Sequence, residues 1–498
     1  MPDQLILSIE NALKSERETT VLLKDIALKH CIDYGYLLVA LHTMRQLRID
    51  EVLEKTLPAS EALLVKAMLI GKLVTCGSKL SIFNWLCREK GICKLLGLDM
   101  SGRKVDQLYY SLGQLWLHQS KIEKKWFRYH QDQVSKRRVY LYDLTSTYFE
   151  GTQNALAAYG YNRDGKRGKM QMCIGLLTAE DGFPLRIEAF AGNTSDSTTV
   201  SGQIRYLKDE LGVDDIVLVG DRGMHITYHL ENDPELADDK RYILSVNPDL
   251  QWKERAFLDS RRERCDALIE NVRKWYAKRC AKNEENLKNQ EEHGKKGKYK
   301  HLKTEVNEKD IKGYIRRVEQ AMNECGMSKY YSVATIDKHS FTVYFDEDEF
   351  EKTRSLCGKY VVCSNVPTEE MTTEEVRGEY KNLQNVEHDF RDLKSDNISL
   401  RPVYHCNENQ TRGHVLLCMF ALAIIKELEN KLFPFLKEYN RTNKLQLSFN
   451  DLKAELNNIK MCELKIGEGV TSIMYPDLTP LQKKILQVLN INPEKMTV

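Results

Sequence analysis

The segment Val139-Tyr-Leu-Tyr-Asp-Leu-Thr-Ser-Thr-Tyr-Phe-Glu-Gly151 carries the strongest fold signal in the chain. Its apolar, aromatic and β-branched residues predict a buried strand that delivers one acid, Asp143, at its end. An ionised Asp in such a strand is costly unless something pairs with it. Asp143 is therefore either a capped strand end or one of several carboxylates around a divalent metal. The positions of the other acidic residues in the sequence distinguish these two interpretations.

A second acid follows a second predicted strand. The segment Asp215-Ile-Val-Leu-Val-Gly-Asp-Arg-Gly-Met224 contains four consecutive aliphatic residues, which are typical of a strand buried on both faces, as in parallel pairing. Asp221 stands at the carboxyl end of this strand, where open α/β sheets place ligands. This position favours the metal interpretation for Asp221 and for Asp143.

A third acid lies on a predicted helix. Thr372 and Glu375 have the spacing of a capping box, so a helix is expected to begin there. An acid flanked on one helix face by an aromatic ring and two cations suits a metal ligand beside DNA phosphates, although a salt-bridged surface explains the same pattern. The residues close to that face are Tyr380, Glu387, Arg391 and Lys394, and the expected buried stripe consists of Val376, Leu383, Val386, Phe390 and Leu393.

The region between the first two acids predicts a β-hairpin and a helix. Strands are expected at 170–178 and 185–190, and a helix at about 198–211. Before them lies a glycine-rich basic loop, 160–169, which is either a cradle for phosphodiesters or an exposed hairpin tip. Its cations are Arg163, Lys166, Arg167 and Lys169.

Composition excludes several classes of protein. The chain has 498 residues and a formal net charge of +2, so a nucleic-acid surface must be local. Its 13 cysteines include no CxxC pair and follow no signal peptide, which predicts reduced thiols in the cytoplasm. The longest apolar run, Val415 to Ile425, is too short to span a bilayer and predicts a core helix.

Shifts in composition predict five regions. The first is helical and is expected to bind DNA ends, with a weak helix-turn-helix signal at Asp25 to Leu47. The others are two parts of an α/β core, a charged insertion that separates them, and a helical tail. The helical region is expected at 1–135, and the two parts of the core at 136–250 and 356–430. The insertion is expected at 251–355 and the tail at 431–498.

Together these motifs resemble a known family. Asp143 in DLTSTYFEG, Asp221 in VGDRGM and the Y-x6-E-x6-K helix through Glu387 are similar to the DDE transposases of bacterial insertion sequences, in the insertion-sequence-four-like superfamily. The resemblance covers about residues 104 to 430. One departure is Leu383, because many relatives carry Arg three residues after the tyrosine.

The resemblance implies an α/β, RNase H-like core, a mixed sheet flanked by helices, with an insertion between the second and third acids and a helical domain before it. It implies cut-and-paste transposition: metal-dependent cleavage at terminal inverted repeats, then strand transfer. Asp143, Asp221 and Glu387 would be catalytic and hold two Mg²⁺ ions, with Mn²⁺ as a substitute.

The resemblance also implies partners and supporting residues. Tyr380 and Lys394 would position the DNA, with Arg391 beside them, and Arg222 would either orient an acid or contact DNA. The expected partners are double-stranded DNA, as transposon ends and target, and a second copy of the chain in a homodimer on DNA. A membrane is not expected, and the protein is expected in the bacterial cytoplasm, associated with the nucleoid when it is bound to DNA.

Two other functions fit part of the pattern. An aspartyl-phosphate phosphotransferase of the haloacid-dehalogenase type would use Asp143 as nucleophile, but it needs a second Asp where Thr145 stands. A transposase-derived DNA-binding protein without activity is the other alternative, and the presence of all three acids argues against it.

Overall fold

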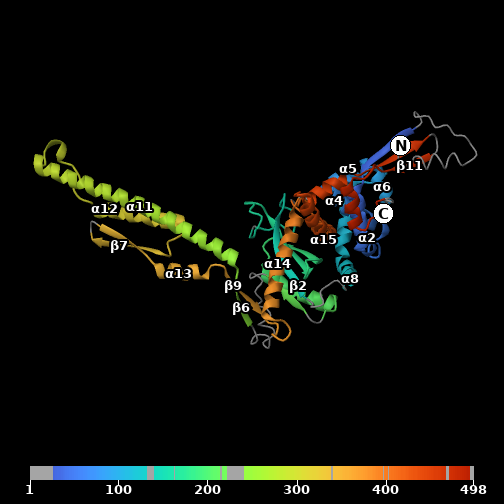
Figure 1. Cartoon of the computed structure of the whole chain (residues 1–498), viewed down its shortest axis with the longest axis horizontal. Helices are drawn as coiled ribbons and strands as arrows, with labels where there is room; N and C mark the ends of the chain where they lie inside the picture. Colours follow the sequence, from blue (N-terminus) through green and yellow to red (C-terminus); the bar gives the residue numbers. More distant parts are fainter. Residues whose placement is uncertain are drawn as a thin grey trace, which may run out of the picture. The chain divides into compact units, whose positions relative to one another are not determined.

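A computed structural model of the chain divides into two compact units, Met1–Asp238 with Thr368–Val498, and Asp239–Pro367 (Figure 1). We call them the first and second unit. The second unit contains the predicted charged insertion and the strands on either side of it. The structure describes residues 26–131, 139–161, 163–213, 216–220, 241–337, 340–395, 397–401, 403–466 and 470–493.

A mixed four-stranded sheet with the order β4-β3-β2-β5 lies in the first unit. β2 pairs antiparallel with β3, and β3 with β4, as expected for the hairpin, whereas β5 pairs parallel with β2. The parallel pairing predicted for the second acidic strand is thus confirmed. The strands are β2 (Val139–Tyr148), β3 (Gln171–Ala179), β4 (Pro184–Ala191) and β5 (Val217–Val219).

β2 extends beyond the predicted position of its acid. Asp143 was expected at the end of the strand, but it lies in the middle and pairs with Leu176 of β3. The strand continues because Thr145, Ser146 and Thr147 are all buried and keep their register with β3. The hydroxyl groups of Thr145 and Ser146 have hydrogen-bond partners there, in Lys394 and in the backbone N–H of Arg163, as buried polar groups usually do.

Helices form much of the rest of the first unit. The predicted core helix is part of α15 (Glu408–Asn443), in which every residue from Gly413 to Ile425 is buried. At Gly413 a Cβ atom would lie 1.9 Å from the Leu112 carbonyl oxygen, so α15 and α7 approach closely. No helix in the described ranges is long and apolar enough to cross a membrane. The helices of this unit that precede the second unit in the sequence are α2 (Gly35–Gln46), α3 (Ile49–Glu54), α4 (Ala59–Thr75), α5 (Lys79–Arg88), α6 (Lys90–Leu96), α7 (Val105–Leu117), α8 (Gln119–His130) and α9 (Asp196–Arg205), which continues as a π-helical turn, Tyr206–Glu210.

A second sheet pairs a strand from the first part of the described residues with two strands from their last part, and it contradicts the helix-turn-helix prediction. Asp25 to Leu47 was expected to form two helices, but its described part begins with a strand, β1 (Ile26–Asp33), before α2. β1 pairs with β10 (Lys460–Ile466), which pairs with β11 (Val470–Met474). The tail is therefore helical only in part, with α16 (Phe449–Asn457) and α17 (Pro480–Val488).

Two cysteines form a disulfide across this sheet, where reduced thiols were predicted throughout. Cys31 of β1 and Cys462 of β10 are register partners and are bonded to one another. They are 431 positions apart in the sequence, so no local pattern marks them as partners. The described part of the chain contains free thiols as well, among them Cys173 and Cys418.

The second unit is built on a helical hairpin. α11 (Pro248–His293) ends at Gly294, whose φ of 68° breaks the helix, and α12 (Glu308–Cys325) packs back against it. Residues 241–246 fall within the range expected for the α/β core, but among the described residues they form a strand that pairs only with β9. The remaining elements are β6 (Arg241–Val246), β7 (Tyr331–Asp337), β8 (Ser340–Phe345), α13 (Glu347–Leu356) and β9 (Lys359–Ser364).

A buried polar cluster lies between α5 and α15 in the first unit. Lys79 is 3% exposed, and its ammonium nitrogen lies at hydrogen-bond distance from His414 Nδ1. Burial first, and then the nearby charge of Lys72, lower the pKa of Lys79 from 10.5 to about 7. Burial also lowers the pKa of His414 and raises that of Cys418.

Lys79 is expected to make stability rise with pH between 7 and 8.5. The unfolded chain keeps the Lys79 proton in this range and the folded chain loses it, so the unfolded state binds more protons and the free energy of unfolding increases with pH. Lys79→Met should flatten the rise in urea midpoint, whereas Lys90→Met, at an exposed lysine, should not. Equal slopes in all three proteins would contradict a neutral buried amine.

Candidate active site

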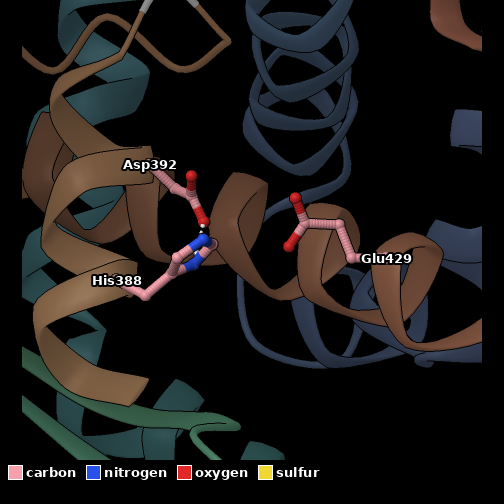
Figure 2. Close-up of side chains that lie close together, drawn as sticks. All are labelled: His388, Asp392 and Glu429. Atoms are coloured by element: carbon pink, nitrogen blue, oxygen red, sulfur yellow. Dashed lines mark ion pairs between the residues drawn. The ribbon is translucent and has the colours of Figure 1, made fainter. Parts of the chain in front are cut away.

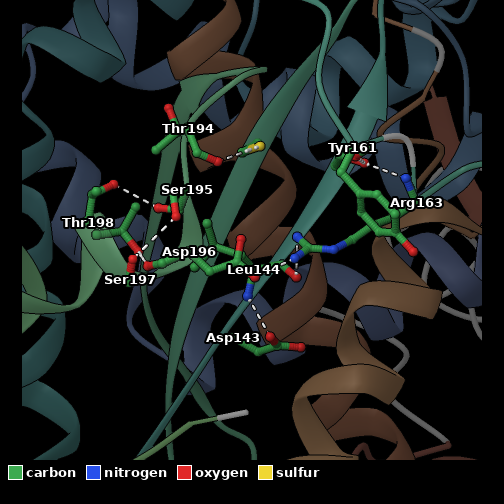
Figure 3. A network of polar contacts seen from close by, with 12 residues as sticks. Asp143, Leu144, Tyr161, Arg163, Thr194, Ser195, Asp196, Ser197 and Thr198 are labelled. Atoms are coloured by element: carbon green, nitrogen blue, oxygen red, sulfur yellow. Dashed lines mark hydrogen bonds and ion pairs between the residues drawn. The ribbon is translucent and has the colours of Figure 1, made fainter. Parts of the chain in front are cut away.

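Asp143 is presented on β2 with its carboxylate half-buried. Asp143 Oδ1 accepts a hydrogen bond of 2.7 Å from the Leu144 backbone N–H (Figure 3). The carbonyl of the same Leu144 accepts a hydrogen bond of 3.0 Å from Arg163, which also pairs with Asp196 at the start of α9. The backbone next to Asp143 is thus held by a side chain from the glycine-rich loop.

The predicted helix of the third acid is confirmed as α14 (Thr373–Lys394). Thr372 and Glu375 form the capping box, and all five residues of the expected stripe are buried. Glu387 and Arg391 are exposed, and Tyr380 is half-buried. Among the described residues Glu387 has no hydrogen-bond or ion-pair partner, so its carboxylate is available to a ligand.

Lys394 does not extend into solvent from α14. Its ammonium group donates to Thr145 Oγ1 and to the Ser146 carbonyl, each at 2.7 Å, and to Asp164 Oδ1 at 2.9 Å. An ammonium group has three donors, so all of them are used. In this arrangement Lys394 joins the end of α14 to β2.

Asp164 is a site residue that the sequence reasoning missed. It lies among the cations of the glycine-rich loop, but its side chain is only 3% exposed and also pairs with Arg401 at 2.8 Å. The prediction for this loop rests on its positive charge alone. A single acid among four cations is the signal that could have indicated an internal ion-pair network.

The four cations of the glycine-rich loop differ in their partners and in their exposure to solvent. Arg163 binds inward to Leu144 and Asp196, and Lys169 pairs with Glu150. Hydrogen bonding to Glu150 raises the pKa of Lys169. Lys166 lies 5.9 Å above the ring centroid of Tyr148, and Arg167 is exposed. The loop is therefore braced on its own unit, with part of its charge facing solvent.

α14 follows β2 in the same direction. Near its middle, Asn385 donates to the carbonyl of Glu180, in the turn beside the beginning of β2, at 3.5 Å. At its end, Lys394 reaches Thr145 and Ser146, near the other end of that strand. α14 therefore passes along the part of β2 that contains Asp143.

The second predicted acid, Asp221, and the neighbouring Arg222 lie outside the described residues. The last described pair of β2 and β5 is Leu141 with Val219, in parallel register. Asp143 and Asp221 each come two residues after a member of this pair.

The opposite side of α14 carries charged groups that the sequence did not reveal. Asp389 is fully buried and pairs with Lys426 of α15 at 2.8 Å. Burial raises the pKa of Asp389 to about 7, and Lys426 partly offsets this. Burial and the nearby Asp392 raise the pKa of Glu429 to about 7 as well. α14 and α15 are separate in sequence, so no spacing rule joins these residues.

Comparison with known proteins identifies a family. The family described as "Transposase DDE domain" matches residues 134–424, which is more than half of the chain and includes β2, β5 and α14. No curated protein and no solved structure matches the chain. Members of this family are transposases, enzymes that cleave DNA, and the mixed sheet flanked by helices is consistent with such a domain. The chain belongs to the transposase DDE domain family.

Proposed function

We propose that the protein is the transposase of a bacterial insertion sequence of the insertion-sequence-four-like superfamily. It binds the terminal inverted repeats, cuts the DNA there and transfers the freed ends to a target. The observation that carries this proposal is the family match, because residues 134–424 contain all three predicted acids. The same match supports an RNase H-like core interrupted by the second unit.

Asp143, Asp221 and Glu387 are the proposed catalytic carboxylates. Glu387 lies two helical turns, about 11 Å, before Lys394 on nearly the same face of α14. Lys394 contacts Thr145, and Asp143 lies two residues earlier on the same side of β2. Since α14 and β2 run in the same direction, Glu387 is displaced from Lys394 towards Asp143. The register of β2 and β5 supports Asp221 as the third member.

These residues fit two Mg²⁺ ions. Carboxylate oxygens are the ligands that Mg²⁺ prefers, and the half-buried Asp143 and the exposed Glu387 leave open positions for DNA and water. The ions, with Mn²⁺ as a substitute, would activate the attacking oxygen and stabilise the leaving oxygen of the phosphodiester. The chain's own residues bind and orient the DNA.

The DNA is proposed to lie along α14 and the glycine-rich loop. Arg391 and Arg167 are exposed cations that can contact phosphates, and such contacts position the duplex without reading its sequence. Tyr380, Lys166, Lys169 and Arg222 are further proposed contacts. Arg163 and Lys394 are proposed to act mainly through the strand they hold. A homodimer on DNA would bring the two transposon ends together.

The test is cleavage of a DNA fragment that spans the gene and both of its flanks. With Mg²⁺ or Mn²⁺ the purified full chain should cut at the two flanks, and with EDTA it should not. A fragment of equal length with both flanks scrambled is the matched control. Binding to the flanks without any cleavage would favour the inactive DNA-binding derivative, and equal cleavage of both fragments would contradict recognition of the ends.

A further inference from the structure

A second group of possible metal ligands lies where α14 meets α15. Figure 2 shows His388 and Asp392 on α14, with Glu429 of α15 pointing towards them. Each residue offers one ligand atom, and the three atoms all lie within 4.8 Å of one another. His388 Nδ1 and Asp392 Oδ2 are 3.0 Å apart. Bond lengths of about 2.1 Å place neighbouring ligand atoms about 3.0 to 3.5 Å apart, so this pair has the right spacing.

We propose that His388, Asp392 and Glu429 bind a divalent transition-metal ion at a site separate from the catalytic carboxylates. The two sites use different sides of α14. At about 100° per residue, His388 and Asp392 are rotated by about 100° and 140° from Glu387. Glu387 therefore lies on the face of Lys394, which contacts β2, whereas His388 and Asp392 face α15.

The site offers two carboxyl groups and an imidazole to a cation. Lys426 of α15 pairs with Asp389 of α14. One divalent ion would balance the charge of both Asp392 and Glu429 when their carboxylates bind it. Glu429 is 8% exposed, and Asp392 is half-buried, with His388 as its ion-pair partner. Burying a carboxylate is costly unless it is paired, and a metal ion would pair with both Asp392 and Glu429.

The ligand types favour a transition metal over Mg²⁺. Imidazole suits Zn²⁺, Fe²⁺, Co²⁺ and related ions, whereas Mg²⁺ prefers oxygen ligands alone. The His388 side chain is 44% exposed, which gives an ion access and leaves room for water as a further ligand. A bound ion would join α14 to α15 and so restrain the helix that carries Glu387. The site does not depend on the proposed function.

Co²⁺ is a suitable probe, because its absorption reports nitrogen and oxygen ligands. The full-length protein, stripped with EDTA, is titrated with CoCl₂ in excess Mg²⁺. Bound Co²⁺ is measured by dialysis and by absorption, and the thermal midpoint is recorded. Intact protein should bind a Co²⁺ ion that Glu429→Gln and His388→Asn both lose, and Co²⁺ should raise the midpoint of the intact protein but not of these two variants.

Two controls locate the ion. Asp143→Asn, at the proposed catalytic centre, and Glu427→Gln, an acid on α15 that pairs with Lys431, should keep the Co²⁺. Circular dichroism without metal should show all variants folded, and Glu429→Gln removes a buried charge, so no loss of stability is expected. Absence of Co²⁺ binding, equal binding by intact protein and both ligand variants, or loss of the ion in Asp143→Asn would each overturn the proposal.

Discussion

Asp143→Asn and Glu387→Gln are each expected to reduce DNA cleavage more than about 100-fold while the protein stays folded and still binds DNA. Loss of a group that merely supports a metal ligand costs up to about 100-fold, so loss of the ligand charge itself should cost more. Both substitutions keep the size of the side chain. In Asp143→Asn the amide oxygen can still accept the hydrogen bond that the Leu144 N–H donates to the native carboxylate. Cleavage of the flank-containing fragment and its retardation on a gel measure the two properties.

The chain offers a matched control for each variant. Asp181 also accepts a hydrogen bond from a nearby backbone N–H, that of Phe183, and Glu374 is an exposed acid in the first turn of α14. Asp181→Asn and Glu374→Gln should therefore cleave DNA as the intact protein does. If Glu387→Gln cleaves as well as Glu374→Gln, the third carboxylate lies elsewhere. If Asp143→Asn is fully active, β2 does not supply a catalytic group.

Asp164→Ala is expected to lower the free energy of unfolding by about 3 kcal/mol. Removing one member of a buried ion pair leaves its partner charged, desolvated and unpaired, which is more costly than removing the whole pair. Asp164 has two such partners, Lys394 and Arg401, and Lys394 is only 13% exposed. Urea unfolding followed by tryptophan fluorescence, with thermal unfolding as a second probe, measures the loss.

Two further variants test the cause of this loss. Glu150→Gln, which breaks the more exposed pair with Lys169, should leave the urea midpoint nearly unchanged. The double variant Asp164→Ala/Lys394→Met should be less destabilised than the sum of its single changes, because the unpaired ammonium group is gone. Additive effects, or a cost no larger than that of Glu150→Gln, would show that Asp164 does not hold α14 against β2.

Local patterns predicted several elements correctly. The run of strand-forming residues around Asp143 forms β2, the aliphatic run before Gly220 pairs in parallel with it, and Thr372 caps α14 through its box with Glu375. These features depend on neighbours within a few positions, where alternation, helical spacing and capping act. The buried stripe of α14 was predictable for the same reason.

Contacts between distant segments were not predictable in this way. Nothing near Cys31 indicates that β1 pairs with β10, and nothing near Arg241 indicates that β6 pairs with β9. The predicted position of Asp143, at the end of its strand, was also wrong, because the strand continues to pair with β3 beyond this residue. Strand pairing depends on which surfaces meet when the chain collapses, and a single sequence does not record this.

The sequence by itself determined the order of the chemical groups: an acid on a buried strand, an acid after a second strand, and an acid on a capped helix, as in the family to which the chain belongs. Only the tertiary structure decided what surrounds them. It turned Lys394 inward to Thr145 and Asp164, and it brought Glu429 to His388 and Asp392. The physical reason is that spacing along one element sets which side chains share a face, whereas burial and pairing of charges depend on the element packed against that face.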